Sequence, residues 1–147
     1  MRGAYWDKER ARGSRKGDVE IVFSRKEDTD VAFNSALDIC IENLDIVFIC
    51  NATHNEVSSK HLALAMHKKN IPNDHHAIQF SQLYGMSDHI SYSLAKAGYN
   101  VSKYLPYGTV KQVIPYLIRR AEENTAIAGQ MGREIKLIEQ AIKRKIE

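Results

Sequence analysis

Apolar and polar positions along the chain follow two periodicities, one typical of buried strands and the other of amphipathic helices. The run LDIVFICNATH (residues 44–54) is unbroken and rich in β-branched residues, which predicts a strand over residues 45–51 buried on both faces. Similar short apolar runs predict three further strands, over residues 3–6, 77–82 and 101–106. The segment EIVF lies between the first two strands, and its pattern does not decide between loop and strand.

Helical spacing of apolar residues separates these strands. It predicts helices over residues 29–43, 55–70 and 87–99, the last ending at Gly98. Two pairs have the spacing of a capping box, Thr53 with Glu56 and Thr109 with Gln112, and the second pair opens a helix after the last strand. Pro115 lies inside that last helix, so we expect it to kink the helix or to mark its first turn.

Strands that alternate with helices of this length indicate βα units and a parallel sheet. The pattern predicts four such units within residues 1–128, followed by a basic amphipathic helix in residues 129–147. In parallel α/β folds, function lies where strands end and helices begin. Candidate functional residues are therefore expected at those junctions.

Composition excludes several classes of protein. The chain has 147 residues, 44% of them hydrophobic, which suits one domain with an ordinary core. The net charge of +3 is too small for the dense basic surface of a dedicated nucleic-acid binder. Cys40 and Cys50 lack metal or redox spacing and are interpreted as reduced core thiols. No apolar run approaches the roughly 18 residues of a membrane span.

The helix after the last strand carries an unusual face. Tyr116, Arg119, Arg120 and Glu123 recur at spacings of three and four, and so share one side of the helix. Such a face is either a solvated surface with ion pairs or a site for an anion. Two adjacent arginines can chelate one carboxylate, which favours the anion site if the helix folds over the sheet.

The junctions themselves hold hydrogen-bonding, aromatic and basic residues. Thr53 and His54 follow one strand, Leu83 follows another, and Tyr104 lies in the last. Each has an ordinary alternative, such as a capping histidine or a packing tyrosine. The basic pair at residues 25–26 suits a phosphate or is simply charged loop. The six histidines show no metal-binding spacing on a predicted helix, so we expect no metal site.

Six motifs in this order resemble the proline dehydrogenase family, and specifically the C-terminal half of its flavin-dependent catalytic domain. They are RGAYWDKE, FSRKEDTD, ATHN, QLYGMSD, NVSKYLPYG and PYLIRRAEEN. The resemblance implies half of a (β/α)8 barrel of the TIM type, with the final helix above the barrel mouth. It also implies FAD as cofactor, oxidation of L-proline to Δ1-pyrroline-5-carboxylate by hydride transfer to flavin N5, and a quinone as electron acceptor.

The resemblance also assigns roles to residues. Arg119 and Arg120 would pair with the substrate carboxylate, while Tyr116, Tyr104 and Leu83 would line the proline pocket. The residues expected to contact FAD, or in the case of Glu123 to hold an arginine or a flavin hydroxyl, are Arg2, Gly3, Arg25, Lys26, Thr53, His54 and Glu123.

A complete barrel needs about 200–250 residues, so the chain is expected to be a fragment of proline dehydrogenase, joined by a missing N-terminal half or by self-association. The alternative is a non-catalytic half-barrel that binds flavin or a partner. A nucleic-acid-binding role for the basic tail is a weaker alternative, because glutamates dilute its charge. A cytoplasmic location is expected, either free or at the inner face of the membrane.

Overall fold

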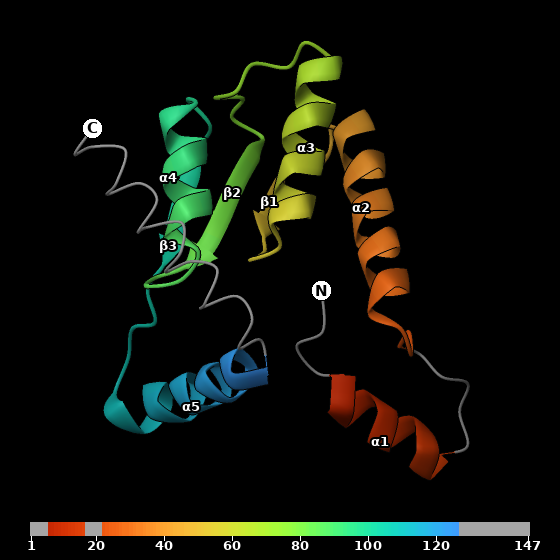
Figure 1. Cartoon of the computed structure of the whole chain (residues 1–147), viewed down its shortest axis with the longest axis vertical. Helices are drawn as coiled ribbons and strands as arrows, with labels where there is room; N and C mark the ends of the chain where they lie inside the picture. Colours follow the sequence, from red (N-terminus) through yellow and green to blue (C-terminus); the bar gives the residue numbers. More distant parts are fainter. Residues whose placement is uncertain (1–5, 17–21, 127–147) are drawn as a thin grey trace, which may run out of the picture.

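The structure is a computed structural model that describes residues 6–16 and 22–126. A parallel three-stranded sheet, in the order β1-β2-β3, lies at its centre. Helices α2, α3 and α4 pack beside the sheet, and α5 lies beyond the carboxyl ends of the strands, at the lower end of Figure 1. The elements are α1 (Trp6–Lys16), α2 (Lys26–Glu42), β1 (Ile49–Ala52), α3 (Glu56–Lys68), β2 (Ile78–Leu83), α4 (Asp88–Lys96), β3 (Val101–Tyr104) and α5 (Val110–Ala126).

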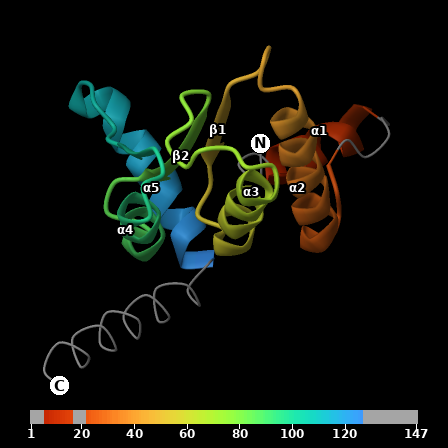
Figure 2. The same ribbon diagram turned by 90° about the horizontal axis from the view of Figure 1, so that it is seen from above.

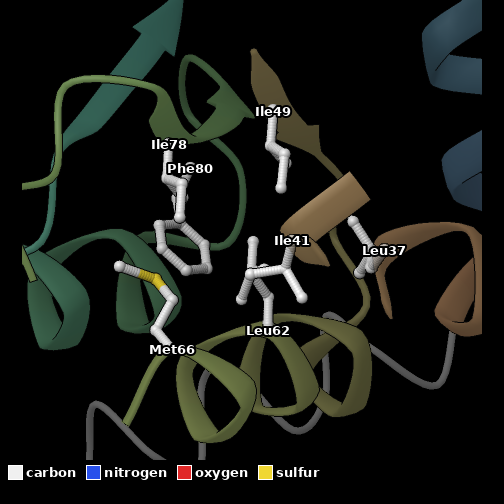
Figure 3. Packing of buried hydrophobic residues seen from close by; sticks show 7 residues of the cluster. All are labelled: Leu37, Ile41, Ile49, Leu62, Met66, Ile78 and Phe80. Atoms are coloured by element: carbon white, nitrogen blue, oxygen red, sulfur yellow. The ribbon is translucent and has the colours of Figure 1, made fainter. Parts of the chain in front are cut away.

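The core fills the space between the sheet and helices α2 and α3. Phe80 of β2 and Leu62 and Met66 of α3 are completely buried there. Phe80 also meets the ring of Tyr99 edge-on, with centroids 5.4 Å apart. Figure 3 shows the buried cluster, which consists of Leu37, Ile41, Ile49, Leu62, Met66, Ile78 and Phe80.

Among the described residues, helices cover one face of the sheet. Along β1 the burial alternates, with Ile49 and Asn51 buried and Cys50 and Ala52 exposed. Seen from above, α3 and α4 lie on the same side of the sheet (Figure 2). Because successive side chains of a strand point to opposite faces, the exposed residues of β1 belong to the uncovered face.

The predicted strands at 45–51, 77–82 and 101–106 are confirmed as β1, β2 and β3, although each has different bounds, and the prediction that the first is buried on both faces is wrong, because Cys50 and Ala52 are exposed. β1 begins only at Ile49, because a turn after α2 occupies the start of the apolar run: the amides of Ile46 and Val47 both donate to the carbonyl of Asn43. Nearby Ile46 and Phe48 are 77% and 76% exposed.

At the N-terminal end, the predicted strand over residues 3–6 falls mostly outside the described residues, and its last residue, Trp6, begins helix α1. Of the segment EIVF (residues 20–23), only residues 22 and 23 are described, and they form no strand before the chain enters α2. The predicted basic tail helix also lies outside the described residues. The half-barrel itself stays a prediction, because the described sheet has three strands.

The predicted capping box of α3 is wrong. Asn55, not Thr53, is the N-cap, and its side-chain oxygen accepts from the Ser58 amide at 3.1 Å. The Thr53 hydroxyl instead accepts from the Asn55 amide at 3.1 Å, and Glu56 pairs with Lys60 at 3.0 Å. Both Thr53 and Asn55 therefore stabilise the turn between β1 and α3.

The other predicted helix ends are closer to the structure. The end of α4 before Gly98 is confirmed: Gly98 has φ +85° and closes a Schellman motif, in which the Tyr99 amide donates to the Leu94 carbonyl at 3.0 Å. At α5, the Gln112 side chain accepts from the Thr109 amide, which is one arm of the predicted box. Pro115 lies inside α5, which begins before it at Val110, so the proline does not mark the first turn.

Candidate active site

The carboxyl ends of the three strands bring four of the predicted site residues, Leu83, Tyr104, Thr53 and His54, to one edge of the sheet. The parallel register pairs Leu83 of β2 directly with Tyr104 of β3. On the other side, Ala52 of β1 is paired with Ser81, so the β1–α3 turn that carries Thr53 and His54 leaves the same edge. The sequence predicted this grouping, and the register of the sheet accounts for it.

An aromatic and guanidinium stack connects this edge to α5. The ring of Tyr104 meets that of Tyr116 edge-on, with centroids 6.0 Å apart and planes at 71°. The guanidinium carbon of Arg120 lies 5.3 Å from the centroid of the Tyr116 ring, within the range of a cation–π interaction. Tyr104 remains 54% exposed, so the stack borders open space at the end of β3.

The structure distinguishes the two arginines, which sequence spacing left equivalent. Arg120 is half-buried and lies over Tyr116, whereas the neighbouring Arg119 is exposed. A guanidinium held on an aromatic ring is pre-oriented for bidentate contact with a carboxylate.

Thr53 and His54 are held by a polar network that extends from β1 to α4. The Gln82 side-chain amide donates to the Thr53 carbonyl at 3.3 Å, and its oxygen accepts from the Ser91 hydroxyl at 2.8 Å. The imidazole Nδ1 of His54 lies 2.9 Å from the Ser87 hydroxyl. Gln82, Ser87 and Ser91 are all buried, where satisfied polar groups fix geometry.

Lys103 anchors the loop between β2 and α4. Its ammonium donates to the Met86 carbonyl at 2.6 Å and pairs with the Asp88 carboxylate at 2.6 Å. The sequence pattern gave no role to Gln82, Lys103, Ser87 or Ser91. For two of them the sequence did offer a signal, because Gln82 and Lys103 directly precede the predicted site residues Leu83 and Tyr104.

The remaining predicted site residues are less well defined by the structure. Arg25 is the N-cap of α2 and Lys26 its first residue; both are exposed and pair with nearby acidic side chains, Arg25 with Glu27 at 3.7 Å and Lys26 with Asp30. Figure 1 places this end of α2 at the same end of the molecule as the carboxyl ends of the strands. Arg2 and Gly3 lie outside the described residues, as does the side chain of Glu123 in α5.

Two other features bear on the kind of site. Within residues 6–16 and 22–126, no group of three or more His, Cys, Asp or Glu side chains is arranged to hold a metal ion. None of the helices in the described part of the chain is both long and apolar enough to cross a membrane.

Comparison with known proteins decides the family. The model of the family described as proline dehydrogenase matches residues 1–133. The chain belongs to the proline dehydrogenase family. Among its relatives are a hydroxyproline dehydrogenase of Xenopus laevis, 37% identical over 153 residues, and the carbapenem antibiotics biosynthesis protein CarD of Pectobacterium carotovorum subsp. carotovorum, 38% identical over 146 residues. Each alignment covers 99% of this chain, but only 32% and 36% of the respective relative. The chain thus spans about a third of the length of these two curated relatives.

Solved structures of the family agree with the fold. Proline utilization A from Bdellovibrio bacteriovorus, inactivated by N-propargylglycine, superposes with a TM-score of 0.76 at 32% sequence identity. The match covers 84% of this chain and 13% of that protein. A proline utilization A variant from Bradyrhizobium japonicum gives a TM-score of 0.71 at 31% identity. The parallel sheet and its helices therefore match part of a larger member of the proline dehydrogenase family.

Proposed function

We propose that the chain supplies the C-terminal part of a flavin-dependent catalytic domain that oxidises L-proline to Δ1-pyrroline-5-carboxylate. The observation that carries the proposal is the stack of Tyr104, Tyr116 and Arg120 at the carboxyl edge of the sheet. It combines an apolar aromatic wall with a fixed cation beside Leu83. Those are the features needed to bind a small zwitterion that has an apolar ring and a carboxylate.

In this proposal, the substrate carboxylate binds to Arg120 and Arg119. The stack on Tyr116 limits the rotation of Arg120, which reduces the entropy lost when the carboxylate binds. Tyr104, Tyr116 and Leu83 contact the proline ring. A small substrate held at one end by its charge and along its ring by side chains presents one carbon–hydrogen bond in a fixed direction.

Residues near the carboxyl edge of the sheet have side chains suited to contacts with FAD. Thr53 and His54 lie on the β1–α3 turn, beside the proposed substrate pocket. Arg25 caps α2 without a side-chain cap hydrogen bond, so the N-terminal end of α2 and the basic pair suit the phosphates of FAD. By family resemblance, Arg2, Gly3 and Glu123 would add further contacts. When bound, FAD supplies the hydride acceptor, and a quinone is the proposed final electron acceptor.

The uncovered sheet face supports completion of the site by another segment. Cys50 and Gln79 are paired across β1 and β2 and are both exposed. Apolar Phe48 is also exposed just before β1, and parallel sheets occur almost only with both faces covered. We infer that the rest of a (β/α)8 barrel covers this face, contributed by an N-terminal half of the domain or by a second copy of the chain.

The test is proline-dependent bleaching of the flavin. The chain would be purified alone and together with the N-terminal half of a catalytic domain of this family, and each would be loaded with FAD. Bleaching by L-proline in the completed domain, lost when Arg120 is replaced by alanine, is the expected result. Tyr92→Ala, on the exposed surface of α4, is the matched control.

Other outcomes would contradict parts of the proposal. FAD binding without bleaching, even in the completed domain, would favour the alternative of a non-catalytic flavin-binding half-barrel. Bleaching by trans-4-hydroxy-L-proline but not by L-proline would show that L-proline is the wrong substrate, while the proposed transfer of a hydride to the flavin would still hold. If the completed domain bound no FAD, the flavin assignment would be wrong.

A further inference from the structure

Ser87 has an unusual conformation for the residue that precedes a helix. It is the N-cap of α4, yet its φ and ψ are 52° and 42°, in the left-handed region that a non-glycine residue rarely adopts. An N-cap serine ordinarily accepts a hydrogen bond from an amide of its own helix. The Ser87 side chain makes no such cap bond. Its hydroxyl lies instead 2.9 Å from Nδ1 of His54, on the preceding βα turn.

Neighbouring groups hold Ser87 in this conformation. Its carbonyl accepts from the Ile90 amide at 3.0 Å and from the Ser91 hydroxyl at 3.3 Å. On either side of it, Lys103 binds the Met86 carbonyl and the Asp88 carboxylate, each at 2.6 Å. Ser87 is only 7% exposed. A strained conformation that is held from both sides is typical of functional sites.

The hydrogen bond has a direct consequence for the imidazole of His54. A partner on Nδ1 fixes the orientation of the ring, and the serine hydroxyl can serve Nδ1 as either donor or acceptor. His54 is one of the two residues of this turn that the proposed function assigns to the flavin. The other, Thr53, is held through its carbonyl by Gln82, which Ser91 in turn binds. The same helix α4 therefore supports both residues.

We propose that Ser87 is a positioning residue for the cofactor: it orients the His54 imidazole toward the flavin before the flavin arrives. This inference rests on the proposed function and deepens it. Ser87 acts only through His54. Lys103 and Ser91 keep the loop in the required conformation, so the orientation exists in the apoprotein as well.

The experiment is a double-mutant cycle in the completed catalytic domain. Ser87→Gly removes the hydroxyl while suiting the left-handed backbone, and His54→Ala removes its partner. The dissociation constant of FAD for the apoprotein is measured by quenching of flavin fluorescence, together with Tm and the imidazole ¹⁵N signals of His54. Ser93→Ala, an exposed serine of the same helix, is the control.

We expect Ser87→Gly to weaken FAD binding by roughly three- to tenfold, the effect of one lost hydrogen bond. Its Tm should be unchanged or higher, because glycine relieves the backbone strain. In the His54→Ala background, Ser87→Gly should have no further effect on the dissociation constant. The Nδ1 signal of His54 should shift in Ser87→Gly and remain in place in Ser93→Ala.

Three results would overturn the inference. They are an unchanged FAD affinity in Ser87→Gly, additive effects of the two substitutions, or an unshifted Nδ1 signal. The wild-type protein separates this inference from the proposed function. If the wild type binds no FAD, the proposed function fails and so does the assignment of Ser87 to the cofactor, while the ¹⁵N signals still report whether Ser87 orients His54.

Discussion

Replacing Arg120 by lysine would test the proposed carboxylate site most directly. Lysine keeps the positive charge but loses the planar fork and the position over Tyr116, where the guanidinium carbon now lies 5.3 Å from the ring centroid. A hydrogen bond to a charged group contributes about 1.5–3 kcal/mol. A cation–π contact at a partly exposed site adds about 0.5–1 kcal/mol.

Together these losses amount to about 2–4 kcal/mol in transition-state binding, or roughly a 30- to 1,000-fold decrease in kcat/KM for L-proline. Removing only the aromatic ring, with Tyr116→Leu, should cost about 0.5–1 kcal/mol, or roughly two- to fivefold. Arg119→Lys should also impair catalysis, through the loss of the planar contact with the carboxylate, because Arg119 is exposed and lysine cannot chelate in a plane.

The assay is steady-state oxidation by the completed domain with an artificial electron acceptor, using L-proline and its neutral amide, L-prolinamide. The wild type should prefer L-proline, and Arg120→Lys should lose most of that preference, because only the acid carries the carboxylate. A kcat/KM for L-proline within about threefold of the wild type in Arg120→Lys, or an unchanged preference over the amide, would refute the carboxylate site.

Three further predictions concern stability, measured by urea denaturation. Phe80→Ala should lower the free energy of unfolding by about 3–5 kcal/mol, because it leaves a cavity in a completely buried site; a loss no larger than that of exposed Tyr92→Ala would contradict the core described above. Asn55→Ala should lower the free energy of unfolding by about 1 kcal/mol, because the hydrogen bond from the Ser58 amide is lost. An unchanged midpoint of urea denaturation would show that water replaces the cap. Gly98→Ala should cost roughly 1–2 kcal/mol from backbone strain at φ +85°, since no atom blocks the added methyl group; a neutral result would mean that the helix end relaxes.

Periodicity predicted the described sheet and its helices well, because burial determines both. It predicted strand starts less well. An apolar run predicts that its residues are buried, but it does not show at which residue the hydrogen bonding between strands begins. β1 was therefore predicted to start before Ile49. The capping error has a similar cause. Thr53 and Asn55 both suit a helix start, and only the turn geometry assigns the cap to Asn55.

For the site, the sequence predicted the gathering of Tyr104, Tyr116 and Arg120, because strand ends and helix faces follow from spacing. It left Arg119 and Arg120 equivalent, since their difference depends on how α5 crosses the strand ends. The network through Ser87 was not predicted either. The network depends on the register of the strands and on the left-handed backbone conformation of Ser87. Neither can be predicted from the pattern of hydrophobic residues.

The order of the sheet has a consequence for the kinetics of folding. Each strand pairs with the next one in the chain, and a single helix closes each crossover. Each pairing must close a crossover, from Ile49 to Ile78 and from Phe80 to Val101, so it forms more slowly than the helices, but sooner than a pairing between strands further apart in the chain would. We expect the unit from α2 to β3 to assemble as the ribosome releases each βα pair. The arginines of α5 are synthesised after it, so the carboxylate site would be completed on a sheet that is already folded.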